Sequence, residues 1–217
     1  MPLRGLDAQR RDLVRIRTNS RHLLGLISSV LDLNRIERGQ VSYDVVPIGV
    51  GSFLSDLDAL VSPQATAKSL TLAYEETDPN LAVLADREKL RQVVLNLLSN
   101  AIRFTPSGGR ITLSAIPVDD TRVTIVVEDT GPGIPEDRRE QVFEPFVQLD
   151  RSLTQSQGGI GLGLAISRDL ARGMGGDLIL DRDTRSGARF VLSLPRGPGL
   201  GDAEQSISGE TRAASKA

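Results

Sequence analysis

The sequence predicts an α/β fold: a two-layer α/β sandwich with one mixed sheet and helices over one face, preceded by a long helix of coiled-coil character. Two observations predict it. Segments with apolar residues at helical spacing are interspersed with short segments in which apolar and polar residues alternate. Glycine, proline and charged clusters separate most of these segments, as turns and loops do. Apolar residues make up 39% of the 217, which is enough to build a core.

One helix is predicted over residues 7–38, with Asp7 as its N-cap and Gly39 after its end. Its apolar residues recur at spacings of three and four, typical of a coiled-coil or bundle seam: Leu13, Ile16, Leu23, Ile27 and Val30. A single helix cannot bury such a seam. We therefore expect another copy of the chain, or another segment, to cover it.

The remaining elements follow in order after Gly39. The predicted strands lie at residues 41–46, 70–74, 82–85, 110–116, 122–128, 178–180 and 188–194. The predicted helices lie at residues 52–68, after Asp86 up to the break at Thr105, and at 161–174. Residues 197–217 have no apolar period and are predicted to be disordered. The expected organisation is therefore a helical segment at 1–39, a domain at 40–196 and a tail.

Three polar residues form a stripe beside the apolar face of the helix that Asp86 caps. Asn96, Asn100 and Arg103 fall within about 60° of one another at about 100° per residue. The Asn carbonyl oxygens suit Mg²⁺, a hard cation, and the Arg fork suits phosphate oxygens. A single mid-helix Asn is more often a solvated surface residue, but two Asn and an Arg on one stripe favour a binding site.

A turn with two glycines follows the predicted strand 122–128. Asp129 ends that strand, and Gly131 and Gly133 let the backbone approach a flat ligand closely. The Asp129 carboxylate could accept a hydrogen bond from an exocyclic amine, the group that distinguishes adenine. For these residues alone, an ordinary strand-to-loop turn is an equally good interpretation.

Gly159, Gly161 and Gly163 come directly before an apolar helix. The free N–H groups and the positive dipole end at a helix start suit phosphate. The spacing matches neither a dinucleotide-binding fingerprint nor a Walker A motif. Residues 144–157 form a polar loop long enough to cover a nucleotide, with Arg151 as a candidate phosphate contact. An unstructured surface loop is the alternative.

Composition excludes several classes of function. A net charge of −2 argues against nucleic acid as a partner. The lack of cysteine excludes disulfides and Cys-ligated metals, and a single histidine, His22, excludes a His-rich metal site. No apolar run approaches the roughly 20 residues that span a bilayer, and the N-terminus lacks a signal-peptide core. We expect a soluble, cytoplasmic chain without membrane contact.

Taken in order, these segments resemble the ATP-binding catalytic domain of sensor histidine kinases of two-component systems, over residues 41–196. The matching segments are DREKLRQVVLNLLSNAIRFTPSGG from Asp86 (the N box), DTGPGIPE from Asp129 (G1), FEPF from Phe143 (F) and GIGLGLAIS from Gly159 (G2). The resemblance implies the Bergerat-type fold of the gyrase, heat-shock chaperone, histidine kinase and MutL ATPase superfamily. It also implies ATP and Mg²⁺ as cofactors.

The resemblance assigns roles to individual positions. Asn100 would coordinate Mg²⁺ with support from Asn96, Asp129 would recognise adenine, and the catalytic residues would be Asn96, Asn100 and Arg103. Further nucleotide contacts would come from Arg103, Phe104, Gly131, Gly133, Ile134, Arg151, Gly159, Gly161, Leu162 and Gly163. Asn96 stands where the related gyrase, MutL and chaperone ATPases carry a Glu that activates water. Because Asn cannot act as a general base, phosphoryl transfer is expected rather than hydrolysis.

Three positions depart from the family pattern. Arg103 stands where Lys is usual, Ile160 replaces a frequent Thr, and Gln148 stands where many members carry an Arg in the loop that covers the nucleotide. The departures bear on the contacts between this loop and the phosphates.

Residues 1–39 resemble the second helix of the family's dimerisation and phosphoacceptor hairpin. The first helix, with its phosphorylatable His in a Ser-His-Glu-like motif, is not found in these 217 residues, and His22 lacks an adjacent acidic residue. The resemblance therefore implies transfer of the γ-phosphoryl of Mg·ATP to a His outside this chain. Relay to an aspartate on a response regulator receiver domain would follow. A homodimer through the first helix is expected, and autophosphorylation of this chain is not.

Two alternatives remain open. A serine/threonine kinase of the anti-sigma-factor type shares this pocket and phosphorylates a small partner protein, but it would not need the long heptad helix. A non-catalytic nucleotide-binding docking module is the second alternative. The presence of Asn100, Asp129 and all the glycines argues against it.

Overall fold

A computed structural model of the chain describes residues 38–75, 77–148, 161–181 and 187–199, together with part of the segment 13–36. Every described residue of that segment is helical, and a turn at Arg38 and Gly39 follows it. The described side chains of the predicted seam are exposed. Near the end of this helix, Leu33 is buried in the main core instead.

The ordered elements follow one another over residues 45–195. The strands are β1 (Val45–Gly49), β2 (Thr71–Tyr74), β3 (Ala82–Asp86), β4 (Arg110–Pro117), β5 (Arg122–Asp129), β6 (Asp177–Leu180) and β7 (Arg189–Pro195). The α-helices are α2 (Val50–Ala67), α3 (Arg87–Phe104) and α4 (Gly163–Gly173). Two short 3-10 turns, Glu136–Arg138 and Gln141–Phe143, lie between β5 and α4.

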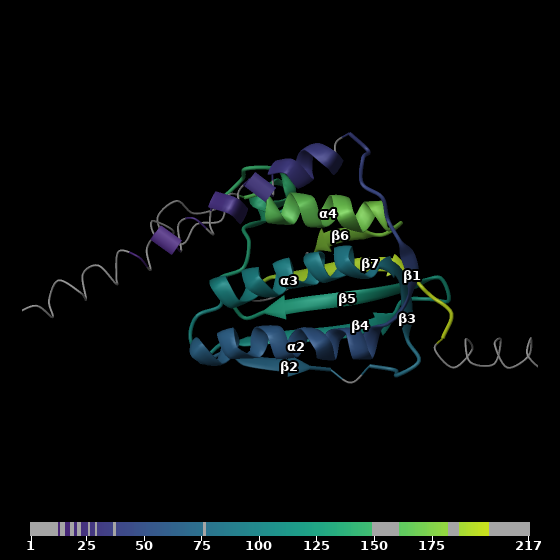
Figure 1. Cartoon of the computed structure of the whole chain (residues 1–217). Helices are drawn as coiled ribbons and strands as arrows, with labels where there is room; N and C mark the ends of the chain where they lie inside the picture. Colours follow the sequence, from purple (N-terminus) through teal and green to yellow (C-terminus); the bar gives the residue numbers. More distant parts are fainter. Residues whose placement is uncertain are drawn as a thin grey trace, which may run out of the picture.

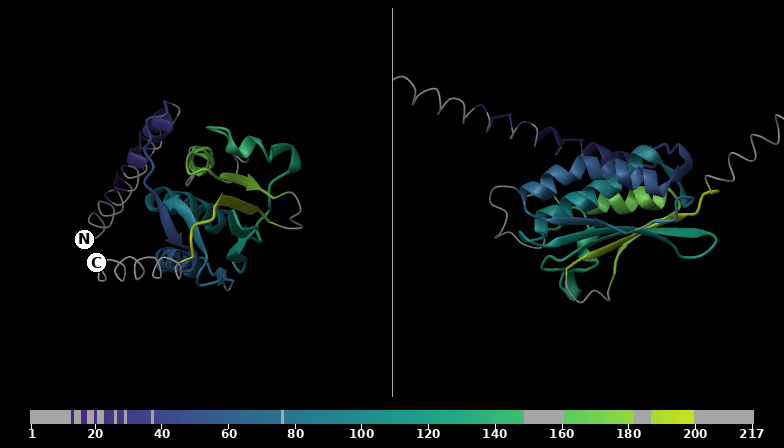
Figure 2. Two further views of the ribbon diagram at one scale, coloured as in Figure 1. Left: turned by 90° about the vertical axis from the view of Figure 1, so that its right-hand side faces the viewer. Right: turned by 90° about the horizontal axis from the view of Figure 1, so that it is seen from below.

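The sheet has the order β2-β4-β5-β7-β6, with β2 parallel to β4 and the other neighbours antiparallel. The helices α2, α3 and α4 cover one of its faces (Figures 1 and 2). The predicted α/β sandwich with a mixed sheet is thereby confirmed. The structure differs in one respect, because β1 and β3 form a separate antiparallel pair. A bridge between Val83 and Arg196 joins this pair to the end of β7.

Helix α3 lies at the centre of the helical layer because one of its faces is almost entirely apolar. Seven of its side chains are buried: Leu90, Val93, Val94, Leu97, Leu98, Ala101 and Ile102. Asp86 caps the helix as predicted, and its Oδ1 accepts the amides of Glu88 and Lys89, each at 3.0 Å. A strong cap and a buried stripe fix both the start and the rotation of the helix that carries the polar stripe.

The first strand lies further along the chain than predicted. Residues 41–44 are not part of a strand, and β1 is Val45–Gly49, which includes Pro47. Pairing with β3, about 40 residues later, determines which residues form β1. The sequence of residues 41–46 does not indicate this pairing. The linker is held nearby, because the amide of Asp44 donates to Asp86 Oδ2 at 3.0 Å.

Within the parts of the chain that the structure describes, no helix combines the length and apolar character needed to cross a membrane.

Candidate functional site

The three segments that carry the predicted chemistry meet at one end of the sandwich. Helix α3 and strand β5 end there, and α4 begins there (Figure 1). The backbone oxygen of Phe104 would lie 3.2 Å from a Cβ at Gly131, and a Cβ at Gly163 would collide with Oδ1 of Asn96. The end of α3 is thus close to the turn after β5, and its middle is close to the start of α4.

Asn96 links α3 to α4. Its side-chain amide donates to Oγ of Ser167 at 2.9 Å, and Ser167 is itself only 1% exposed. Because the same Asn side chain lies against Gly163, a Cβ there would have to displace the Asn96 amide. The predicted stripe residue Asn96 therefore joins α3 to the first turns of α4.

Asn100 and Arg103 follow Asn96 along α3 and are half-buried, at the rim of the core as the stripe predicts. The Arg103 guanidinium lies 5.1 Å from the centroid of the Phe104 ring, which is within cation–π range. The Phe104 side chain is 49% exposed. An exposed aromatic ring beside a guanidinium offers a flat apolar surface and a charged fork to a ligand.

Asp129, at the end of β5, is 7% exposed. Its Oδ1 accepts the amide of Gly131 at 2.7 Å and that of Ala188 at 3.4 Å. Burial raises the pKa of the Asp129 carboxyl above its usual value, outweighing the two amide hydrogen bonds, which lower it; the nearby Glu128 carboxylate raises it slightly. With Oδ1 engaged by the backbone, Oδ2 is the oxygen best placed for a ligand.

The turn after Asp129 packs against the residues before β7. Gly133 has φ +74°, and a Cβ there would lie 2.8 Å from the backbone oxygen of Gly187. Both the conformation and the close approach require glycine. Ile134, one residue on, packs partly buried against the core and anchors the end of the turn.

The start of α4 is held from two sides. Gly161, with φ +78°, accepts the amide of Phe146 at 2.9 Å, and Leu162 is 2% exposed. The described part of the predicted glycine-rich start therefore has a fixed backbone. Arg151, Gly159 and Ile160 lie outside the described residues, so their predicted contacts stay predictions.

The F-box segment is anchored by Phe143, which is buried against two partners. Its ring packs edge-on against Phe190, with centroids 6.3 Å apart, and the Arg168 guanidinium lies 4.7 Å from its centroid. Arg168 also pairs with Asp177 at 3.2 Å and Glu140 at 3.3 Å. These contacts tie the segment before residue 147 to α4 and β6.

Two residues of this site carried no separate signal in the sequence. Ser167 closes the G2-box match, but nothing in the sequence pairs it with Asn96, 71 positions earlier. Ala188 donates its amide to Asp129 from the segment before β7, and an alanine that acts through its backbone leaves no trace in a pattern of side chains. Both contacts depend on tertiary structure.

The described residues bring together no group of three or more acidic, His or Cys side chains suited to a metal ion. A divalent cation in this site would thus rely on few protein ligands. Mg²⁺ accepts that arrangement, since it keeps several waters and binds largely through substrate phosphates. The half-buried Asn100, with its carbonyl oxygen at the rim, fits this requirement.

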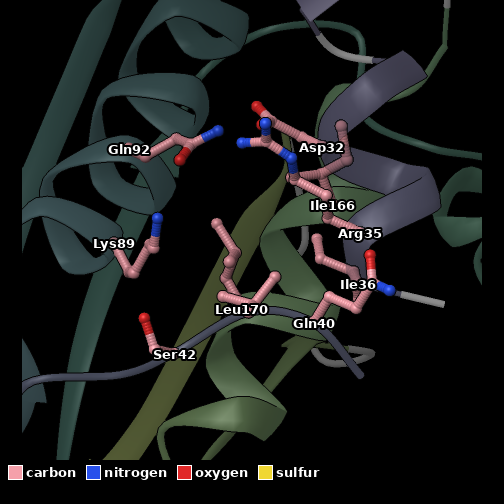
Figure 3. A pocket seen from close by; sticks show the side chains of 10 residues that line it. Asp32, Arg35, Ile36, Gln40, Ser42, Lys89, Gln92, Ile166 and Leu170 are labelled. Atoms are coloured by element: carbon pink, nitrogen blue, oxygen red, sulfur yellow. The ribbon is translucent and has the colours of Figure 1, made fainter. Parts of the chain in front are cut away.

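A separate cleft of about 150 Å³ lies where the first helix meets α3 and α4. Figure 3 shows Lys89 and Gln92 of α3 facing Asp32 and Arg35 of the first helix across it. Gln92 is one turn from Asn96. The cleft is therefore next to the polar stripe and lies at the boundary between the first helix and the rest of the chain.

Comparison with known proteins agrees with this geometry. The family described as Histidine kinase-, DNA gyrase B-, and HSP90-like ATPase matches residues 85–198. Sensor protein GacS from Pseudomonas syringae pv. syringae is 36% identical over 200 residues, which are 89% of this chain and 22% of GacS. This chain covers only 13% to 36% of the length of the curated relatives it matches.

Solved structures of histidine kinases also match this chain. Full-length ShkA in complex with AMPPNP is 35% identical with a TM-score of 0.77, covering 88% of this chain and 39% of ShkA. Histidine kinase ThkA in complex with the response regulator protein TrrA is 25% identical with a TM-score of 0.64, covering 84% of this chain and 50% of that one. With the matched residues containing α3, the Asp129 turn and α4, the chain belongs to the histidine kinase-, DNA gyrase B- and HSP90-like ATPase family, as an ATP-binding catalytic domain homologous to those of sensor histidine kinases.

Proposed function

We propose that this domain binds Mg·ATP and transfers the γ-phosphoryl group to a histidine on an acceptor helix outside this chain, for relay to an aspartate of a response regulator. The observation that carries the proposal is the buried Asp129 carboxylate beside the exposed end of α3. A buried carboxylate whose Oδ1 is engaged by the backbone could accept the exocyclic amine of adenine at Oδ2. The relative ShkA is solved with AMPPNP, an ATP analogue.

The phosphate end of the nucleotide would face the other half of the site. Arg103 would contact phosphate oxygens through its fork, and Asn100 would hold Mg²⁺ through its side-chain oxygen. The free N–H groups at the start of α4 would donate hydrogen bonds to further phosphate oxygens. Bound Mg²⁺ would supply neutralisation of the phosphate charge.

In the proposed reaction an imidazole nitrogen of the acceptor attacks the γ-phosphorus. A P–N bond forms, the bond between the γ-phosphorus and the bridging oxygen breaks, ADP leaves, and the imidazole loses its N–H proton to solvent. Asn96 donates to Ser167 and has no basic group, so it would not activate water. The chain's own contribution is positioning and charge neutralisation.

The proposal of a histidine acceptor rests on the sensor kinase relatives and on the first helix. Leu33 of that helix is buried in the domain core, and the cleft shown in Figure 3 separates the helix from α3. The acceptor hairpin that this helix resembles would thus lie beside α3, the helix that carries Asn96, Asn100 and Arg103. ThkA is solved with the response regulator protein TrrA, which supports a similar partner here.

Calorimetric titration with a non-hydrolysable ATP analogue, with and without Mg²⁺, tests the first step. We expect Mg²⁺-dependent binding by the wild type that Asn100→Ala loses. Incubating the chain with Mg·ATP and an acceptor hairpin from a related sensor kinase tests the second. With ATP labelled at its γ-phosphate, label that acid removes from the hairpin would indicate a phosphohistidine. Acid-stable label would indicate a hydroxyl acceptor and refute the proposal. A wild-type chain that binds no nucleotide would refute the proposal at its first step.

A further inference from the structure

The turn between α2 and β2 supports the end of α3. The Lys68 ammonium donates to the backbone oxygen of Ile102 at 2.7 Å and to that of Arg103 at 2.6 Å. The next residue, Ser69, accepts the amide of Gly108 at 3.0 Å. Helices α2 and α3 end on the same side of the molecule, so this one turn holds both the last turn of α3 and the loop that follows it (Figure 1).

The last turn of a helix needs such support because its carbonyl groups have no donors within the helix. In α3 the carbonyl of Ala101 accepts the amide of Thr105 at 3.0 Å and its hydroxyl at 2.6 Å. The next two carbonyls, of Ile102 and Arg103, accept Lys68. The positive charge also lies at the negative end of the helix dipole, where it is most favourable.

This last turn carries side chains of the proposed phosphate site. Arg103 stacks on Phe104, and the backbone oxygen of Phe104 lies close to Gly131 in the turn that holds Asp129. If the turn frayed, the Arg103 guanidinium would lose its fixed direction. Lys68, 35 residues away in sequence, holds the backbone from which this guanidinium extends.

We propose that Lys68 is a positioning residue, which orients Arg103 toward the phosphates of ATP without touching the nucleotide itself. The inference rests on the proposed function, in which Arg103 contacts phosphate. It adds a residue from the turn after α2, outside the segments that carry the predicted site.

The test compares calorimetric affinities for the ATP analogue with Mg²⁺ in five variants. Lys68→Met keeps the aliphatic stem and removes the ammonium, and Lys68→Arg keeps the charge. Lys89→Met is the matched control, because it makes the same change at the opposite end of α3. The fourth variant is Arg103→Ala, and the fifth combines it with Lys68→Met. Thermal melting establishes that each variant is folded.

We expect Lys68→Met to weaken binding by about tenfold, equivalent to about 1.4 kcal/mol. Lys68→Arg should recover most of that loss, and Lys89→Met should bind as the wild type does. In the Arg103→Ala background Lys68→Met should cost nothing further, since its effect passes through Arg103.

An equal loss in both backgrounds would overturn the proposal, as would full affinity of Lys68→Met or an equal loss in Lys89→Met. If Lys68→Met does not fold, Lys68→Arg together with Lys68→Gln in both backgrounds gives the same comparison. A wild type that binds no nucleotide would refute the proposed function instead.

Discussion

Replacing Asp129 with Asn changes one atom of the proposed adenine contact and leaves the shape of the side chain unchanged. Oδ1 would keep its hydrogen bonds from the amides of Gly131 and Ala188, while an NH₂ group would replace Oδ2. That group would face the adenine amine donor to donor. A hydrogen bond to a charged group contributes about 1.5–3 kcal/mol, and about 1.4 kcal/mol corresponds to a tenfold change in affinity. We therefore expect Asp129→Asn to weaken ATP binding by roughly 10- to 150-fold.

The same substitution should leave the fold intact, which separates binding from stability. Burial raises the pKa of Asp129, so the ionised carboxylate opposes folding at neutral pH, and removing its charge removes that opposition. Thermal melting of Asp129→Asn should give a midpoint no lower than that of the wild type. Calorimetry then measures the affinity. An unchanged ATP affinity in a folded Asp129→Asn chain would refute the assignment of Asp129 to adenine.

Three further outcomes follow from the described contacts. ATP affinity of the wild type should fall on acidification as the Asp129 carboxylate takes up its proton, at a pH above that of an ordinary aspartate, and Asp129→Asn should show no such dependence in a calorimetric pH series. Ser167→Ala removes the acceptor of the Asn96 amide and should lower the free energy of unfolding by about 1–2 kcal/mol in urea titrations; no change would show that water replaces the hydroxyl. Gly133→Ala forces a left-handed backbone and a contact with Gly187, so it should destabilise the chain by at least about 1–2 kcal/mol, and a stability equal to wild type would contradict the geometry of the turn.

Local patterns predicted most of the domain because several of its elements are specified locally. Asp86 signals the start of α3 by capping it, and the buried stripe from Leu90 to Ile102 has helical spacing. The strands β4 and β5 are rich in β-branched residues and a short turn joins them, so their pairing could be predicted from the sequence. In such cases the chemistry that makes the element lies within a few residues of it.

The register of β1 and the contacts between distant segments could not be predicted. β1 pairs with β3, and local alternation at residues 41–46 indicated a strand at the wrong place. The bond from Asn96 to Ser167 and that from Lys68 to Arg103 join segments far apart along the chain. Periodicity describes one element at a time, so it cannot show which side chain of another element will complete a contact.

The proposed ligand site and the exit of the chain lie at opposite ends of the sandwich. At one end α3 and β5 finish beside the start of α4, while at the other end Arg196 and Gly197 leave the sheet after pairing with β3 (Figure 1). Gly197 donates its amide to Ala82 at 2.8 Å, which fixes the direction in which the chain leaves the domain. A fluorophore or a fused protein attached at residue 199 would therefore start from the end remote from the proposed nucleotide site. For protein engineering, this domain can be extended at its carboxyl side while its ligand site stays open to titration.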